Sequence, residues 1–205
     1  MYITPDQVRS PIGRWQLEEV LQDRGPANCA YAMGRWDGKP CIAFRWNGND
    51  DSPGTPQSRG QPTWMILDHE LYPAILEWLP LERRPSLRRF LGLGLRFDGT
   101  TLSEDQSRLG LWDISRRPPI IAEVACTDLK EALGLPSITP ENCRLLADRN
   151  RDLLTEVADA LFFDQQRYTT GSNGVTKVVK IGTAELAPVA KQFSTTVLDI
   201  VPRWG

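Results

Sequence analysis

The sequence predicts an α+β fold of mostly antiparallel sheet with helices packed on one side, arranged as two β-sheet-plus-helix halves. Three observations predict it: a hairpin signal at Asp37-Gly38, strand-to-helix junctions in both halves, and a globular composition with 40% hydrophobic and 24% charged residues. The 205 residues fit one large domain or two small ones. We expect a boundary between residues 1–85 and 86–205, with one continuous domain as the alternative.

The first half is predicted to be a β-meander closed by a helix. Runs of apolar residues bounded by turn residues mark its strands, and Asp68 is a natural N-cap for its helix. The segment 82–90 carries four arginines and is predicted to link the halves. The elements expected here are strands at 15–23, 28–36, 40–46 and 64–67 and a helix at 69–79.

The hairpin predicts two unlike faces for the central strands. A two-residue turn at Asp37-Gly38 makes Tyr31 face Phe44 on a side of large apolar residues, which also carries Cys29 and Trp46. The opposite side is small, so another layer can approach it closely, and Arg45 is expected at its rim. Cys29 and Cys41 fall on opposite faces, which disfavours a disulfide. The small residues are Ala30, Ala32, Gly34, Cys41 and Ala43.

The second half begins near Phe90 and reads as strands followed by helices. Thr139 and Pro140 form a typical helix start, and Asn150 lies beside the apolar stripe of that helix, where a buried amide needs partners. We expect Asn150 to bind a strand or loop carbonyl, or else to face a ligand pocket. The elements expected are strands at 91–97, 110–114, 120–126, 175–181 and 196–201 and helices at 128–133, 139–163 and 184–193.

Composition and motifs exclude several classes of protein. The chain carries 24 basic and 26 acidic residues, which argues against an indiscriminate polyanion binder. No apolar run approaches the roughly 18 residues of a membrane helix, and the start shows no signal-peptide pattern, so we expect a cytoplasmic protein. The four cysteines form no C-x-x-C pair, and His69 is the sole histidine. We therefore expect reduced thiols, no metal site and no cofactor, and no residue is assigned a catalytic role.

Two segments resemble known bacterial sequences. The strings IIAEVACTDLKEAL, ADRNR and VTKVVKIGTAEL, within residues 118–186, resemble a small bacterial domain of unknown function built as strand, E-A-L, Asn-Arg helix and strand. The strings GRWDGKPCIAFRWNG and PQSRGQPTW, within residues 34–64, look similar to stretches of uncharacterised bacterial and mobile-element proteins. The resemblances imply a bacterial origin, and neither implies an activity.

The segment 47–63 is the predicted binding site. It has 17 residues without a hydrophobic side chain other than proline, and structureless loops of that length are usually functional or disordered. Arg45 and Arg59 are suited to clamp a carboxylate or phosphate, and Trp46 or Trp64 to stack on a ligand or a partner side chain. The structural alternative buries Trp46 and Trp64 in the core. The residues assigned to binding are Arg45, Trp46, Asn47, Gln57, Ser58, Arg59 and Trp64.

The leading hypothesis is a cytoplasmic bacterial binding or interaction protein, such as a mobile-element accessory factor, which recognises a protein or a small anion through the loop 45–64. One alternative is an enzyme for a phosphate- or carboxylate-bearing substrate, with Arg45 and Arg59 as anion clamps. The other is a nucleic-acid binder that uses the arginine cluster at 83–96, formed by Arg83, Arg84, Arg88, Arg89 and Arg96. A homodimer and a monomer remain equally open.

Overall fold

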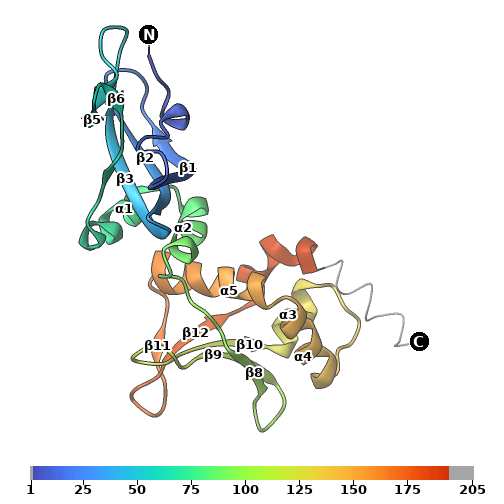
Figure 1. The fold of residues 1–205 in the computed structure, drawn as a ribbon. Helices are drawn as coiled ribbons and strands as arrows, with labels where there is room; N and C mark the ends of the chain where they lie inside the picture. The colour runs from blue at the N-terminus through green and yellow to red at the C-terminus, as the bar shows by residue number, and fades with distance from the viewer. Residues whose placement is uncertain (1, 194–205) are drawn as a thin grey trace. The chain divides into compact units, whose positions relative to one another are not determined.

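The computed structural model describes residues 2–193. The chain divides into two compact units, Met1–Leu93 (unit 1) and Gly94–Gly205 (unit 2), and the predicted boundary after residue 85 falls inside a helix of unit 1. Each unit combines a mainly antiparallel sheet with helices, so the predicted α+β class is confirmed (Figure 1). The predicted strand at 196–201 lies outside the described residues.

Unit 1 is built on a three-stranded meander that follows the predicted hairpin. Its strands are ordered β1-β2-β3, and two short strands pair along the far side of β3. In β2 and β3 the partners are Tyr31 with Phe44 and Cys29 with Trp46, so the predicted register is confirmed. The strands are β1 (Trp15–Asp23), β2 (Cys29–Trp36), β3 (Lys39–Asn47), β4 (Gly54–Thr55), β5 (Gln57–Ser58), β6 (Gln61–Pro62) and β7 (Met65–Ile66).

The small face of the meander accepts a closely packed layer, as the sequence predicts. A methyl group added at Gly34 would lie 2.4 Å from the Trp15 ring, so only glycine permits this contact. The Trp64 ring packs 5.9 Å from the Trp15 ring, and its indole N–H donates to the carbonyl of Val8 at 3.1 Å. The N-terminal segment, which includes the 3₁₀ turn Pro5–Gln7, is thereby fixed against the sheet.

Helices cover part of the large face of the same sheet. Asp68 accepts the backbone N–H of Glu70, which confirms the predicted cap, but the helix starts as a 3₁₀ turn that leaves Leu71 exposed. Tyr72 is buried instead, and its hydroxyl oxygen accepts a hydrogen bond from the Ile42 N–H at 3.3 Å. The predicted arginine linker is also helical. The helices are η2 (His69–Leu71), α1 (Tyr72–Trp78), η3 (Leu81–Arg83) and α2 (Arg84–Phe90).

Unit 2 contains one five-stranded sheet with helices over one face (Figure 1). Its order is β11-β12-β10-β9-β8, and only the β10–β12 pair is parallel. Alternate residues such as Leu109, Leu111, Ala122 and Val124 are buried beneath the helices, as expected for a sheet with one covered face. The strands are β8 (Gly99–Leu102), β9 (Arg108–Asp113), β10 (Ile120–Ala125), β11 (Thr169–Thr170) and β12 (Lys177–Ile181).

The longest helix predicted in unit 2 is interrupted in the structure. Thr139 accepts the backbone N–H of Asn142, which confirms the helix start, but the expected helix 139–163 is interrupted at Asn150, where φ is −110° and ψ is 26°. The Asn150 amide donates to the Leu146 carbonyl of its own helix at 2.8 Å. The helical segments are α3 (Cys126–Ala132), α4 (Pro140–Arg149), α5 (Arg151–Asp159), η4 (Ala160–Asp164), α6 (Thr183–Leu186) and η5 (Ala187–Val189).

The strand predicted at 91–97 is wrong. This segment forms no ladder, although Leu95 and Phe97 enter the core and supply the apolar pattern that suggested a strand. The Leu95 N–H donates to the buried carboxylate of Asp159 at 2.8 Å. This side chain supplies the hydrogen-bond acceptor that a neighbouring strand would otherwise provide. The first strand of the unit is β8 instead.

Candidate functional site

Arg45 is an interior residue of unit 1. Its side chain is fully buried, so the expectation that it lies at the rim of the small face is wrong. One guanidinium nitrogen, Nη2, donates to the Pro53 carbonyl at 2.5 Å, while Nε and Nη1 have no hydrogen-bond partner. Burial lowers the pKa of Arg45, and the neighbouring Tyr2 and Asp23 act in the opposite direction. In this arrangement the guanidinium binds the backbone at Pro53, and it is not accessible for bidentate binding of an anion from solvent.

Asn47 has a similar structural role. Its side-chain amide donates to Asp23 Oδ1 at 2.8 Å and to the Gly25 carbonyl at 2.9 Å, which ties the end of β3 to the β1–β2 turn. The following loop folds back tightly, since a Cβ on Gly54 would lie 2.3 Å from the Trp46 carbonyl oxygen. The segment 47–63, predicted as a loop, contains three short strands, β4, β5 and β6.

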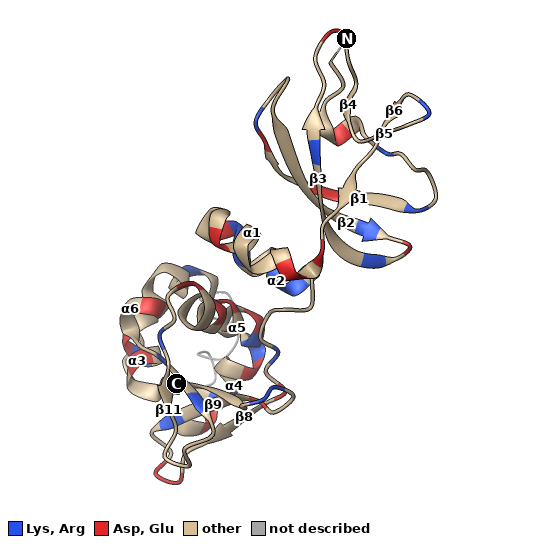
Figure 2. Ribbon diagram, turned by 90° about the vertical axis from the view of Figure 1, so that its left-hand side faces the viewer, with Lys and Arg blue, Asp and Glu red and all other residues tan. Residues whose placement is uncertain are grey.

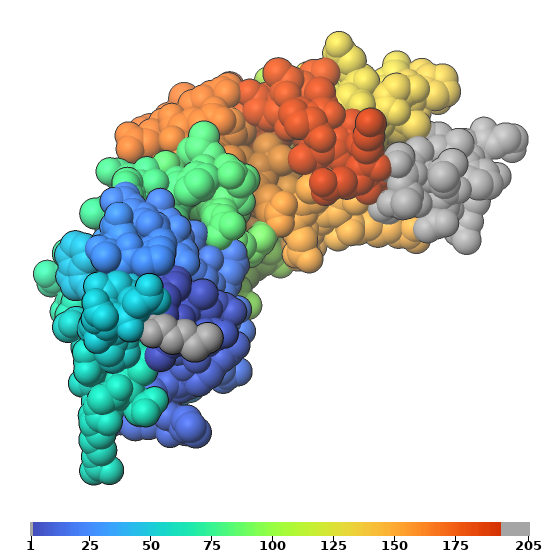
Figure 3. All heavy atoms as spheres, turned by 90° about the horizontal axis from the view of Figure 1, so that it is seen from above, coloured from blue at the N-terminus to red at the C-terminus, as the bar shows by residue number. Residues whose placement is uncertain are grey.

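The polar centre of this segment forms a hairpin of its own. Gln57 and Ser58 (β5) pair with Gln61 and Pro62 (β6), and Arg59 occupies the turn with φ of 52°. The hairpin projects from the body of unit 1 as a narrow finger (Figure 3). Because Arg45 is in the interior and Arg59 is at an exposed tip, the structure does not bring the two predicted anion clamps together.

The two tryptophans of the predicted site lie on opposite faces of the sheet. Trp64 is buried on the small face, where the Arg45 guanidinium lies 5.9 Å from its ring centre. Trp46 belongs to the large face and is 54% exposed. Of the seven residues assigned to binding, Trp46 is the one with a large, accessible apolar surface.

The arginine cluster is mostly engaged within unit 1. Arg83 donates to Glu19 at 3.1 Å and to the carbonyls of Val20 and Leu21, so it covers backbone groups on the outer edge of β1. Arg84 donates to the carbonyls of Leu79 at 2.9 Å and Glu77 at 2.5 Å. Arg88 is 3% exposed, and Arg89 is exposed. Basic and acidic residues alternate across the unit rather than forming a face of one sign (Figure 2).

A row of four aromatic side chains runs across the uncovered part of the large face. Trp46 contacts Phe44 at a ring-centre distance of 5.5 Å, Phe44 contacts Tyr31 at 5.1 Å, and Tyr31 contacts Trp78 of α1 at 4.9 Å. We call Trp46, Phe44, Tyr31 and Trp78 the aromatic row. Its two ends are the more exposed members, and Trp78 is 43% exposed. The interplanar angles of 88°, 62° and 72° make each ring an edge-to-face partner of the next.

Two further side chains extend the aromatic row. Met65 of β7 sits opposite Phe44 in the ladder and is 47% exposed. The guanidinium of Arg24 stacks over the Trp78 ring at 4.5 Å from its centre. The hairpin register already placed Tyr31, Phe44 and Trp46 on one face, but the sequence did not show that the helices would leave this part of the face open. It also gave no signal that brings Trp78 to Tyr31.

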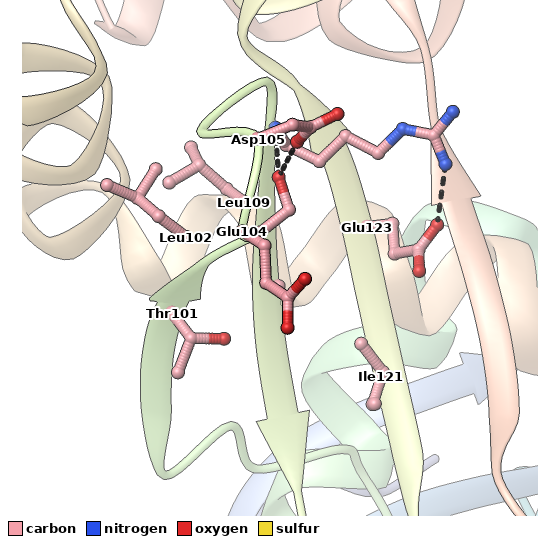
Figure 4. Close-up of a pocket in the computed structure, with 10 residues that line it drawn as sticks. Thr101, Leu102, Glu104, Asp105, Leu109, Ile121 and Glu123 are labelled. Carbon is pink, nitrogen blue, oxygen red and sulfur yellow. Dashed lines mark hydrogen bonds and ion pairs between the residues drawn. The ribbon is translucent and has the colours of Figure 1, made fainter. Parts of the chain in front are cut away.

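Unit 2 has a hollow of about 550 Å³ on the sheet face away from its helices (Figure 4). It opens where Gly110 carries no side chain, between Thr101 of β8 and Glu123 of β10, with Ile121 beside it. The charged groups at its border are largely occupied by one another, since Arg108 lies 3.7 Å from Glu123.

The turn that borders this hollow is held by its own hydrogen bonds. Asp105 accepts from the Ser103 hydroxyl at 2.5 Å and from the Ser107 N–H at 3.1 Å, which lowers its pKa to about 2. The carboxylate therefore organises the β8–β9 turn. Its bonds are local to that turn and assign no ligand to the hollow.

Other chemistries find little support in the described part of the chain. Residues 2–193 contain no cluster of three side chains suited to hold a metal ion, and none of their helices is long and apolar enough to cross a membrane. His69 is exposed, and its Nδ1 lies 3.1 Å from the Asp68 carboxylate. Comparison with known proteins finds no matching family model, no matching curated protein and no matching solved structure.

Proposed function

We propose that the protein is a binding protein that docks a protein partner on the aromatic row of unit 1. The observation that carries the proposal is the continuous apolar surface between Trp46 and Trp78, two tryptophans that are each about half exposed. Tryptophan, tyrosine, methionine and arginine are the residue types that protein interfaces favour, and all four occur here. A contiguous exposed patch of this kind marks an interaction site more often than scattered apolar residues do.

A protein partner fits this surface better than a nucleic acid does. Residues 1–93 contain 11 basic and 11 acidic residues, so the unit has no excess charge to attract phosphates. Neighbouring rings of the aromatic row are nearly perpendicular, so they cannot present one continuous platform to stacked bases. An apolar segment of a protein can fit the edges and faces of such rings by shape alone.

The earlier alternatives lose their supporting features. An anion-clamp enzyme needs Arg45 and Arg59 at one place, whereas the first is in the interior and the second at a hairpin tip. A nucleic-acid site at the helix α2 needs free guanidiniums, whereas Arg83 and Arg84 are bonded to the protein itself. An accessory role in a mobile element is compatible with a docking protein and rests on sequence resemblance alone.

Site-directed photo-crosslinking in the native host tests the proposal. A photoreactive phenylalanine analogue is placed at Trp46, at Trp78 or, as the control, at Ile12, which is 90% exposed and lies in the turn before β1, at the Asp37 end of the hairpin. We expect the same protein to be crosslinked from positions 46 and 78 and not from position 12. Crosslinks to nucleic acid, or equal crosslinking from all three positions, would contradict a protein-docking surface.

A further inference from the structure

Arg24 places a positive charge at one end of the aromatic row. It follows the last residue of β1, and its guanidinium lies over the Trp78 ring at 4.5 Å from the ring centre. The backbone at this point is fixed, because the Arg24 N–H donates to the Cys29 carbonyl at 3.0 Å. The Arg24 side chain is exposed, and its guanidinium forms no hydrogen bond and no ion pair with any of residues 2–193.

Arg14 shows what a stacked guanidinium of this protein binds when an acid is in reach. It lies over the Trp36 ring at 4.7 Å from the ring centre, while its Nε donates to Asp37 Oδ1 at 2.9 Å and its Nη2 donates to Oδ2. Stacking uses the flat face of a guanidinium and leaves the donors at its edge for a carboxylate. Arg35 repeats this arrangement, since it stacks on an aromatic ring and donates to Glu18 at 3.0 Å.

We propose that the partner of the aromatic row is an acidic, apolar peptide segment, whose Asp or Glu carboxylate binds Arg24 while its apolar side chains cover Trp46 and Met65. This inference rests on the proposed docking function and names the chemistry of the partner. Charge complementarity carries it, because Arg24 has the ring but lacks the carboxylate that completes the same arrangement at Arg14 and Arg35.

The stacked guanidinium makes the surface selective. The rings of the aromatic row accept any apolar segment that fits their shape, whereas a pair of N–H donors requires two oxygens at a fixed place. Because Trp78 already orients Arg24, little conformational freedom is lost when a carboxylate binds. The ion pair therefore determines which apolar segments are bound and in which direction they lie along the row.

Selection from a library of random linear peptides tests the inference. The peptides are displayed on phage by their C-terminal ends, so that Asp and Glu supply their only carboxylates, and the full-length protein is the bait. We expect enrichment of peptides that combine aromatic or aliphatic residues with Asp or Glu. Arg24→Gln should enrich apolar peptides without the acidic preference, and Trp46→Ala should enrich no common sequence. The control Arg14→Gln removes a stacked arginine that already binds Asp37, so it should enrich the same peptides as the wild-type protein.

The Kd of a selected peptide, measured by fluorescence anisotropy after synthesis, shows whether Arg24 binds its acid. We expect Arg24→Gln to weaken binding by about 10-fold, the lower end of what a charge-assisted hydrogen bond contributes. Replacement of the acidic residue of the peptide by its amide should have a similar effect. Combining the two changes should cause little further loss, because both remove the same ion pair. Arg14→Gln should leave Kd unchanged.

The outcomes separate this inference from the docking function on which it rests. Enriched peptides without an acidic preference, no enriched sequence at all, or an acidic peptide that binds Arg24→Gln as tightly as the wild-type protein would overturn the inference alone. Self-association of the full-length protein that Trp46→Ala abolishes would also overturn it, since a second copy would then be the occupant. Selected peptides that bind Trp46→Ala as tightly as the wild-type protein would instead contradict docking on the aromatic row.

Discussion

Replacement of Arg45 separates a structural role of this side chain from a ligand-binding role. The guanidinium makes one hydrogen bond, to the Pro53 carbonyl, and leaves Nε and Nη1 buried without partners. A hydrogen bond from a charged donor contributes about 1.5–3 kcal/mol, and a buried polar group without a partner costs about 1–3 kcal/mol. These terms nearly cancel when the polar head is removed but the volume is kept. We therefore expect the free energy of unfolding of Arg45→Met to lie within about 2 kcal/mol of the wild-type value.

Arg45→Ala removes the same bond and also most of the side chain. The additional cavity is comparable to that of a buried Met-to-Ala change, which costs about 2–5 kcal/mol. The free energy of unfolding of unit 1 should therefore fall by that amount between Arg45→Met and Arg45→Ala. Urea denaturation followed by tryptophan fluorescence measures it, because Trp15 and Trp64 are buried in the same cluster.

Equal destabilisation by Arg45→Met and Arg45→Ala would refute this reasoning. It would mean that the guanidinium forms strong interactions beyond the Pro53 carbonyl, for example with an ordered water or an anion in the interior. That result would support the predicted ligand-binding role of Arg45. A small loss in Arg45→Met and a large loss in Arg45→Ala would support the structural role.

Three further predictions concern the stability of the two units. Gly34→Ala should lower the unfolding free energy of unit 1, measured in denaturant, by about 1–3 kcal/mol, because the added Cβ would lie 2.4 Å from the Trp15 ring. The control Gly110→Ala should be tolerated, because its Cβ would lie 3.4 Å from the nearest atom. Trp64→Phe should cost about 1 kcal/mol in the same assay, since it deletes the N–H bond to the Val8 carbonyl. Burial raises the pKa of Asp113, but hydrogen bonds from Ser115, the Arg96 N–H and Arg116 outweigh it, and the net pKa is lowered. The carboxylate therefore stabilises unit 2 above its unfolded pKa of about 4, and this contribution is lost as pH falls further; the unfolding free energy should drop more steeply between pH 5 and pH 3 in the wild-type protein than in Asp113→Asn.

Local turn chemistry made the first half of the fold predictable. The Asp37-Gly38 turn determines the β3 partner of every residue in β2. The small residues on the face turned away from Phe44 predict a close layer there, which is the packing of Trp15 on Gly34. The Asp68 and Thr139 caps are equally local, because each side chain accepts an N–H two or three residues ahead. Features of this kind depend on neighbouring residues and can be inferred from sequence.

Features that depend on distant contacts could not be inferred. The segment 91–97 has the apolar pattern of a strand, but Asp159, 64 positions away from Leu95, supplies its acceptor. The buried state of Arg45 depends on the return of the chain at Pro53, and polarity alone suggested a surface residue. The same applies to the aromatic row, where the pairing of Tyr31 with Trp78 requires α1 to cross one part of the sheet and leave another part open.

The most direct test of the docking surface is the dissociation constant Kd for the partner recovered by crosslinking, measured by calorimetry with purified proteins. Trp46→Ala should weaken binding by about 30-fold or more, the loss expected when a tryptophan that dominates an interface is removed. Ile12→Ala should leave Kd unchanged, and both variants should remain folded, because Ile12 is 90% exposed and Trp46 is about half exposed. A folded Trp46→Ala variant that binds as tightly as Ile12→Ala would contradict docking on the aromatic row.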